Sequence, residues 1–254
     1  MYPVLFSIGP LTIHTYGLFV ALAFLVGLGL AILQAKKEGI PHNTIADLGF
    51  YVLVASLVGS RLFFILINFS YYANNPLDIL KIWEGGLVFY GGVLLAVPTA
   101  IWFVVRHNLG IWRTADIFAP ALAIGHALGR IGCFFAGCCY GKFTDSLPWG
   151  VVFSDPECLA PINVPLHPTQ LYESAGEVLN FMILITLRRK KSFDGQLFMG
   201  YLILYSMLRF VVEFFRGDIQ RGFLTDTLSV SQGISILIFC AGVAGYLLLQ
   251  RKRG

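Results

Sequence analysis

Three arginines lie inside long apolar runs of the sequence. Arg61 stands in VASLVGSRLFFILIN, Arg130 in HALGRIGCFFAGCCYG and Arg209 in LILYSMLRFVVEFFRGD. An ionised side chain at the centre of a bilayer costs on the order of 3 kcal/mol or more, so such residues usually face a partner or a wet cavity. A guanidinium group can hold phosphate or carboxylate through two hydrogen bonds. The arginines are therefore candidate anion-binding residues, although each taken singly could also form a structural ion pair or snorkel to the interface.

The local surroundings of Arg209 and Arg130 differ. Tyr205 and Glu213 lie four residues either side of Arg209 and share its helical face. This spacing predicts an ion pair between Arg209 and Glu213. Arg130 has no carboxylate at helical spacing. We therefore expect Arg130 to be an unpaired cation near the outer end of a helix, where the abundant anion is lipid phosphate.

The chain has five cysteines, at positions 133, 138, 139, 158 and 240. They form no CxxC pair and no second cluster with zinc spacing, so we expect neither a structural zinc site nor any other metal or organic cofactor. Cys138, Cys139 and Cys158 fall in or beside an external loop, where an oxidising compartment permits a disulfide. A disulfide from Cys158 to Cys138 or Cys139 is a hypothesis. Cys133 and Cys240 are expected to act as small apolar packing residues.

Two further segments could contact a ligand. WEGGLVFYGG, from Trp83, places two glycine pairs around Tyr90, and such a segment can bring backbone close to a ligand. HPTQLYE, from His167, opens a predicted helix with Pro168 suited to its first position. Helix capping alone would also explain the second segment.

The composition decides the solvent in which the chain folds. Hydrophobic residues make up 57% and charged residues 13%, and the mean hydropathy is +0.74, so the chain is predicted to be an all-α polytopic membrane protein. We expect one integral membrane domain over residues 1–254, with an external loop at about 138–169. Seven predicted spans cover about 14–35, 46–68, 87–106, 115–137, 170–187, 196–214 and 229–249.

Basic residues predict the orientation of these spans. Eleven of the eighteen Lys and Arg residues lie in segments that share one side if the spans alternate. That side is the cytoplasm by the positive-inside rule, which places the N-terminus outside and the C-terminus inside. The first span is too long for a signal-peptide core, so we expect it to be retained. The net charge of +4 then reflects topology and gives no indication of nucleic-acid binding.

Six blocks in order carry a resemblance to a known family. HTYG, GSRLFF, WEGGLVFYGG, GRIGCFFAGCCYG, HPTQLYE and RFVVEFFRGD together resemble the prolipoprotein diacylglyceryl transferase family of the bacterial plasma (inner) membrane. The resemblance implies transfer of the diacylglyceryl group of phosphatidylglycerol to the lipobox cysteine thiol of a prolipoprotein. A thioether forms and glycerol phosphate leaves. The implied partners are phosphatidylglycerol, prolipoprotein signal peptides and the lipid bilayer, with no cofactor.

The resemblance also suggests roles for single residues. Arg130 matches the phospholipid-binding arginine of the family, Arg209 matches its second essential arginine, and Arg216 falls on another family position. The residues expected to be catalytic are Arg209, Tyr90, Tyr16 and Glu213. Those expected to bind phosphatidylglycerol are Arg130, Arg61, Gly141, Tyr205 and His167.

The chain departs from the family pattern at several positions. The family usually has His where this chain has Tyr90, and Asn where it has Cys133, with acidic or amide residues shortly after where Ala136 and Cys138 stand. Tyrosine has an unperturbed pKa near 10, so we expect Tyr90 to orient lipid or substrate by hydrogen bonding. The base that deprotonates the thiol is left open.

Three alternatives stand beside the transferase. Intramembrane arginines suit an anion or metabolite transporter, but the halves show no evident repeat and the number of spans is odd. A thiol oxidoreductase could use Cys138 and Cys139, although adjacent cysteines are a poor match to CxxC chemistry. The departures at Tyr90 and Cys133 also allow a family member that binds lipid without activity.

Overall fold

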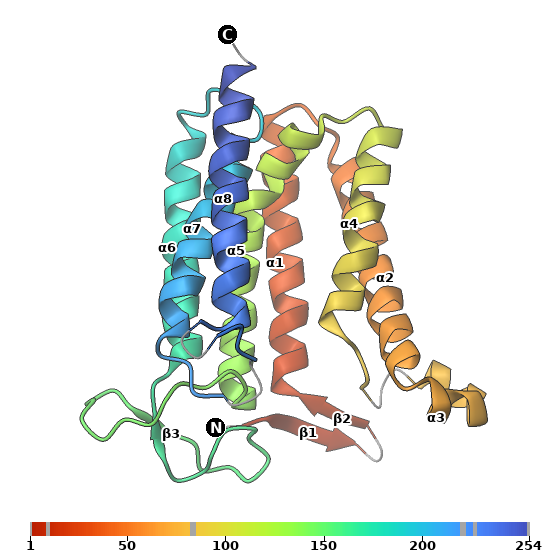
Figure 1. Ribbon diagram of the computed structural model, residues 1–254. Helices are drawn as coiled ribbons and strands as arrows, with labels where there is room; N and C mark the ends of the chain where they lie inside the picture. The colour runs from red at the N-terminus through yellow and green to blue at the C-terminus, as the bar shows by residue number, and fades with distance from the viewer. Residues whose placement is uncertain (1, 9–10, 82–84, 219–221, 226–227, 253–254) are drawn as a thin grey trace. The chain divides into compact units, whose positions relative to one another are not determined.

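The architecture comes from a computed structural model that describes residues 2–8, 11–81, 85–218, 222–225 and 228–252 (Figure 1). Trp83 and Glu84 of the predicted glycine-rich segment lie outside these described residues. Internal contacts divide the chain into two compact units. Unit 1 comprises Met1–Ala31 and Ala115–Gly254, and unit 2 comprises Ile32–Thr114. The single membrane domain over residues 1–254 stays a prediction.

The described residues form a helical protein with seven long helices. Their bounds are α1 Thr15–Lys37, α2 His42–Ile67, α4 Phe89–Arg106, α5 Ile111–Ala136, α6 Thr169–Arg188, α7 Gln196–Glu213 and α8 Val230–Arg251. All seven predicted spans correspond to one of these helices, with ends that differ by a few residues. Six of them, all except α6, are long and apolar enough to cross a membrane. The prediction of a polytopic α-helical membrane protein is confirmed.

Helix α6 differs from the other long helices in carrying polar side chains inward. At 20 residues it has the length of a span. Its buried residues are Thr169, Gln170, Glu173, Ser174, Glu177, Asn180 and Leu184. A polar group in a bilayer must find its partner inside the protein. The low hydropathy of α6 therefore marks a helix whose polar face is enclosed by its neighbours.

Unit 2 is built on close packing between α2 and α4, which lie side by side (Figure 1). A Cβ atom added at Gly59 would lie 2.3 Å from the carbonyl oxygen of Gly91, and one added at Gly92 would lie 2.5 Å from the Ser60 hydroxyl. Small residues at such crossings let helix backbones approach in lipid. The short helix α3 (Phe69–Asn74) and the 3-10 helix η1 (Pro76–Leu80) follow α2.

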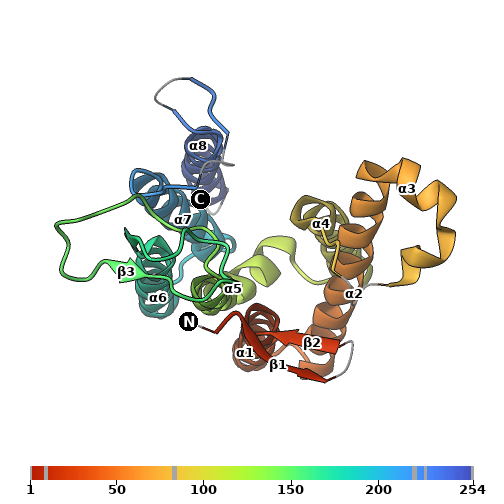
Figure 2. The same cartoon turned by 90° about the horizontal axis from the view of Figure 1, so that it is seen from below.

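Unit 1 gathers α5, α6, α7 and α8, which are seen end on in Figure 2. Asp116 of α5 is fully buried and accepts hydrogen bonds from the backbone N–H groups of Gly195 and Phe198 at the start of α7, at 2.8 and 2.9 Å. Lys191 lies 3.0 Å from the same carboxylate. The acid satisfies N–H groups that a helix start leaves without partners, and it thereby fixes α7 against α5.

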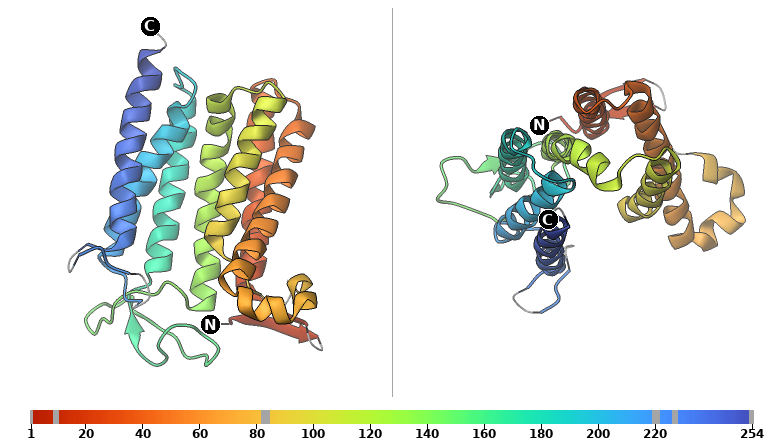
Figure 3. Two further views of the ribbon diagram at one scale, coloured as in Figure 1. Left: turned by 45° about the vertical axis from the view of Figure 1, so that its right-hand side comes forward. Right: turned by 90° about the horizontal axis from the view of Figure 1, so that it is seen from above.

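One end of unit 1 carries most of its irregular structure, and we call it the loop end. It comprises the segment 137–168, which joins α5 to α6, and the described residues between α7 and α8 (Figure 3). The first of these contains the two-stranded sheet of β3 (Val151–Val152) and β4 (Pro165–Leu166). Phe153, Ala160 and Leu166 form a small buried apolar cluster there. The predicted external loop therefore has its own packed core.

A β-hairpin at the N-terminus, β1 (Val4–Ile8) with β2 (Leu11–His14), precedes α1. No strands were predicted in this segment, which lies almost entirely before the first predicted span at about 14–35. Its two halves pair through the backbone as an antiparallel hairpin.

The glycine contact between α2 and α4 leads to a stability prediction. Gly59→Ala places a methyl group against the Gly91 carbonyl, and overpacking of this kind costs about 1–3 kcal/mol. We expect a lower melting temperature in detergent, measured by circular dichroism. Gly29→Ala on α1 is the matched control, because an added Cβ atom there meets nothing within 4 Å. An equal effect of the two substitutions would contradict the packing.

Candidate functional site

The polar residues of unit 1 collect within the turns of its helices nearest the loop end. Arg130 lies in the last two turns of α5, Glu173 in the second turn of α6 and Arg209 in the penultimate turn of α7. Ser231 is the second residue of α8. Four helices thus present charged or polar side chains at similar depth.

Arg130 is paired, contrary to the expectation of an unpaired cation. Its Nη2 atom lies 2.9 Å from Oε1 of Glu173, whose side chain is 1% exposed. The partner comes from α6, forty-three residues along the chain, so helical spacing within α5 could not reveal it. The Arg130 side chain retains 14% exposure, which leaves part of the guanidinium accessible.

His126 joins Arg130 to a second buried carboxylate. Arg130 Nε donates a hydrogen bond to His126 Nε2 at 3.1 Å. Nδ1 of the same ring lies 3.5 Å from Oε1 of the fully buried Glu177, and Nε2 lies 3.7 Å from Oε1 of Glu173. His126 therefore stands between the two buried carboxylates and Arg130.

Arg209 forms the predicted ion pair with Glu213, with Nη2 2.8 Å from Oε2. The same nitrogen donates to the Ser231 hydroxyl of α8 at 3.1 Å. The other terminal nitrogen, Nη1, is buried and has no hydrogen-bond partner among the residues that the structure describes. A buried donor without a partner is costly, so Arg209 is poised to hold an anionic group.

Two tyrosines border these arginines. Tyr205 lies within electrostatic range of both Arg130 and Arg209, and its ring packs 5.4 Å from that of His126. Tyr16, at the start of α1, packs on α5, because an added Cβ atom at Gly132 would lie 3.4 Å from its ring. The structure therefore brings Tyr205 together with both arginines and places Tyr16 beside the turn of α5 that follows Arg130.

Gly141, His167 and Arg216 belong to a backbone clasp at the loop end. Gly141 N–H donates to the His167 carbonyl at 3.0 Å, and residue 141 forms a β-bridge with Arg216. A Cβ atom on Gly141 would lie 2.4 Å from atoms of His167, so only glycine fits. Arg216 in turn holds Asp218 with Nε 2.7 Å from Oδ1. The clasp ties the segment 137–168 to the end of α7.

Three cysteines meet at the end of α5. The Sγ atoms of Cys133, Cys138 and Cys139 lie within 4.8 Å of one another, which corrects the expectation that Cys133 only fills apolar space. Hydrogen bonds with Cys133 and Cys138 lower the pKa of the Cys139 thiol, and Arg216 and Arg130 act in the same direction.

The disulfide hypothesis is not met, because all five cysteines are free thiols. The Cys158 side chain packs instead over Gly137, where an added Cβ atom would lie 3.0 Å from Cys158 Cβ. It is also part of the apolar cluster around Phe153.

Arg61 and Tyr90 lie in unit 2. The Arg61 guanidinium donates to backbone carbonyls of the segment after α3 and of the glycine pair before α4, namely Asp78, Ile79, Lys81, Gly85 and Gly86. Its donors are thus used to fold that segment over α2. Tyr90, in the first turn of α4, is 65% exposed. The two residues belong to a different compact unit from Arg130 and Arg209.

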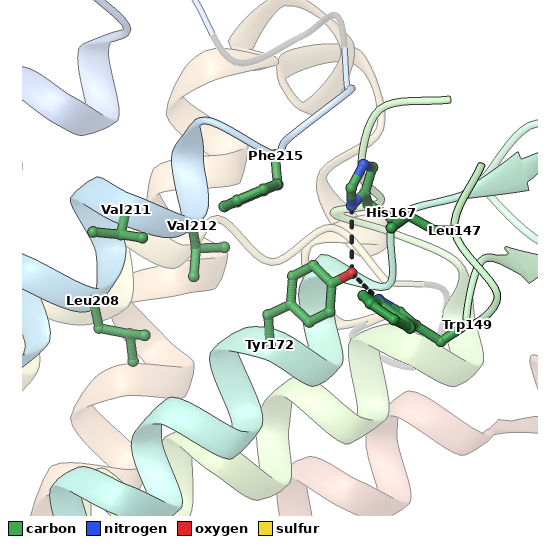
Figure 4. A pocket seen from close by; sticks show the side chains of 8 residues that line it. All are labelled: Leu147, Trp149, His167, Tyr172, Leu208, Val211, Val212 and Phe215. Atoms are coloured by element: carbon green, nitrogen blue, oxygen red, sulfur yellow. Dashed lines mark hydrogen bonds between the residues drawn. The ribbon is translucent and has the colours of Figure 1, made fainter. Parts of the chain in front are cut away.

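A cavity of about 480 Å³ opens between α6, α7 and the loop segment (Figure 4). Its walls are apolar except for three groups joined by hydrogen bonds. Trp149 Nε1 donates to the Tyr172 hydroxyl at 2.8 Å, and His167 Nδ1 lies 3.3 Å from the same oxygen. The remaining lining residues are Leu147, Leu208, Val211, Val212 and Phe215. An apolar chain with few polar atoms fits such a cavity.

Comparison with known proteins decides the family. A family model described as "Prolipoprotein diacylglyceryl transferase" matches residues 3–248. The chain belongs to the prolipoprotein diacylglyceryl transferase family. Relatives named phosphatidylglycerol--prolipoprotein diacylglyceryl transferase support this. That of Finegoldia magna is 39% identical over 94% of this chain and 92% of its own length. The relative from Geobacter sulfurreducens is 36% identical over 99% of this chain and 96% of its own length. The relative from Clostridium tetani is 36% identical over 96% of this chain and 96% of its own length.

Several members of this candidate site were not predicted from the sequence. Glu173 and Glu177 were not singled out as partners of Arg130 and His126. Their spacing of four residues places them on one face of α6 and could have indicated a charged site. Two carboxylates on one face of a membrane helix need cations nearby. Ser231 carries no such signal, because a lone hydroxyl at a helix start is most simply a capping residue.

The Arg130 to Glu173 pair leads to a second stability prediction. Glu173→Gln leaves a buried guanidinium without its counter-charge, and breaking a buried pair in this way costs about 3–5 kcal/mol. We expect a large fall in the melting temperature in detergent. The double variant Arg130→Met/Glu173→Met should regain most of it, because no buried charge is left unpaired. The control Asp194→Asn alters a 58% exposed carboxylate and should change stability by less than about 1 kcal/mol. Equal effects of the two single substitutions would contradict a buried, stabilising pair.

Proposed function

We propose that this chain transfers the diacylglyceryl group of phosphatidylglycerol to the lipobox cysteine thiol of prolipoproteins, in the bacterial inner membrane. The thiolate sulfur attacks the glyceryl carbon that carries the phosphodiester. A carbon–sulfur bond forms as the carbon–oxygen bond breaks, and glycerol phosphate leaves with the bonding electron pair. The thiol proton is released. Family membership and the relatives' names support this reaction.

The observation that carries the proposal is the free terminal nitrogen of Arg209. Nη1 is buried and without a partner among the described residues, while Nη2 is held by Glu213 and Ser231. One side of the guanidinium is thus fixed and the other is available to the departing phosphate. A preorganised donor aimed at developing negative charge is usually the largest single contribution to catalysis.

Arg130 is the proposed holder of the phosphate in the bound lipid. Its pairing with Glu173 fixes the guanidinium in place and leaves it partly exposed. Tyr205 lies within electrostatic range of both arginines, and its hydroxyl can donate a hydrogen bond to the same phosphate. Glu213 and Tyr16 are assigned positioning roles, for Arg209 and for the turn after Arg130.

The remaining expected residues act at a distance from the phosphate in this proposal. His167 lines the apolar cavity between α6 and α7, which suits a stretch of acyl chain. Gly141 keeps the backbone clasp closed. Arg61 acts indirectly, by holding the segment before α4 through its carbonyls. The alternatives of a transporter or an inactive lipid-binding relative have no observation that favours them over transfer.

A direct assay tests the proposal. Purified protein in detergent is given phosphatidylglycerol and a lipobox peptide, and mass spectrometry scores the diacylglyceryl mass on the peptide cysteine. Arg209→Lys keeps the charge but removes the planar fork, and we expect a fall in kcat of about 100- to 1000-fold. Arg130→Ala should show no product. Arg106→Ala, an exposed arginine in the last turn of α4, should retain activity. Absence of product with folded, lipid-binding wild-type protein would overturn the transferase.

Tyr90 provides a separate test of how the substrate is oriented. Tyr90→Phe removes a hydroxyl from an exposed side chain and keeps the ring. If the hydroxyl contributes one orienting hydrogen bond, turnover should fall by no more than about tenfold. Complete loss of turnover with lipid binding intact would show instead that the Tyr90 hydroxyl takes part in proton transfer.

A further inference from the structure

The thiol cluster of Cys133, Cys138 and Cys139 is not used by the reaction as described above. The nucleophile in that reaction is the thiol of the substrate, and the two arginines account for the phosphate. Yet the chain brings three sulfur atoms within 4.8 Å of one another at the loop end of α5, and all three residues are only half-buried.

The backbone is held in the conformation that gathers these thiols. Helix α5 ends at Ala136, and Gly137 follows with φ of +72°. The Cys138 N–H then donates to the Cys133 carbonyl at 3.2 Å, which returns Cys138 over the last turn. Cys139 has φ of +61°, a region that L residues with side chains rarely occupy. Strain of this kind persists only where surrounding contacts enforce it, and it gathers at functional sites.

Two buried side chains from the first turn of α6 provide those contacts. Gln170 Nε2 donates to the Cys138 carbonyl at 2.7 Å, and the Thr169 hydroxyl donates to the Cys139 carbonyl at 2.8 Å. Both α6 residues are almost wholly buried. The carbonyls next to the thiols are therefore fixed by the same helix that supplies Glu173 to Arg130.

The ligand number and geometry suit a soft divalent cation. Tetrahedral zinc with Zn–S bonds of about 2.3 Å holds its sulfur ligands about 3.8 Å apart, so small side-chain rotations would close the three thiols on an ion. Among the described residues, no His, Asp or Glu completes the group to four ligands. Catalytic zinc sites have three protein ligands and one open position, whereas structural sites are closed.

The surrounding charge also matches such a site. Three thiolates and one divalent cation carry one net negative charge. Arg130 and Arg216 both lie within electrostatic range of Cys139, so this charge would have cations beside it. No metal was expected because the C-x4-C-C spacing matches no common zinc pattern. The turn after α5 nevertheless brings the three sulfur atoms together.

We propose that Cys133, Cys138 and Cys139 bind a zinc ion whose fourth position takes the lipobox thiol of the substrate. This inference rests on the proposed transfer reaction and supplies the group that deprotonates the nucleophile. A coordinated thiol is deprotonated outright, so its proton passes to water on binding. The zinc-bound sulfur then forms the bond to the glyceryl carbon, the carbon–oxygen bond breaks, and glycerol phosphate leaves. The zinc charge is unchanged throughout.

Metal binding can be measured without any turnover. Chelator-treated full-length protein in detergent is titrated with Co²⁺, which replaces zinc and reports thiolate ligands by charge-transfer absorption. We expect an equimolar, tetrahedral, sulfur-rich spectrum that Zn²⁺ displaces. Cys138→Ser and Cys139→Ser should each weaken binding by at least about tenfold, since even changes to groups behind a ligand weaken sites by 10- to 100-fold. Cys240→Ser, an exposed thiol on α8, is the matched control.

Substrate entry is tested on the zinc-loaded protein by X-ray absorption. Adding a lipobox peptide should raise the sulfur count at zinc from three to four, whereas the same peptide with Ser in place of its Cys should not. This test uses only wild-type protein, so its result does not depend on whether a variant folds. A wild-type cobalt spectrum that lacks thiolate bands would overturn the site, and so would an unchanged sulfur count with the cysteine peptide.

The two proposals fail in different ways. Full transfer activity in protein stripped of metal would overturn the zinc role and leave the transferase standing. Zinc that accepts the peptide sulfur while no diacylglyceryl group is transferred would uphold the site and overturn the proposed function.

Discussion

The arrangement of unit 1 depends on the neutralisation of charge inside an apolar chain. Arg130 of α5 is matched by Glu173 of α6, and Arg209 of α7 by Glu213 of its own helix and Ser231 of α8. Inside a bilayer, such groups have no water to hydrogen-bond with and must find their partners within the protein. The helices must therefore meet in the one register that brings these partners together, and the same pairs that fix the register hold the arginines that we propose to bind the lipid phosphate.

The turn after α5 connects this charged layer to the thiols. Glu173 and the pair Thr169 and Gln170 stand on the first two turns of one helix, so the group that neutralises Arg130 and the groups that hold the cysteine backbone move as one body. The clasp between Gly141 and Arg216 then ties the same turn to the end of α7. Helix α6 therefore sets both the position of the Arg130 guanidinium and the geometry of the thiols, even though it is the one long helix that is not apolar enough to be a candidate span.

The sequence predicted the helices and the family correctly because both follow from local patterns. Span length and composition predict a helix in lipid, and the pair Arg209 and Glu213 follows from spacing within one helix. The partner of Arg130 was missed because it lies on another helix, and the meeting of the thiols was missed because it depends on positive φ at Gly137 and Cys139. The N-terminal hairpin was missed because its strands are only five and four residues long, too short to show a clear alternation of apolar and polar residues.

The contact between Arg209 and Ser231 makes the start of α8 part of the surroundings of that arginine. Helix α8 begins with a capping box in which Ser229 and Gln232 hold each other's backbone N–H groups, and this start sets the position of Ser231. The conformation of a helix cap therefore decides whether a charged group on the neighbouring helix keeps one of its hydrogen bonds.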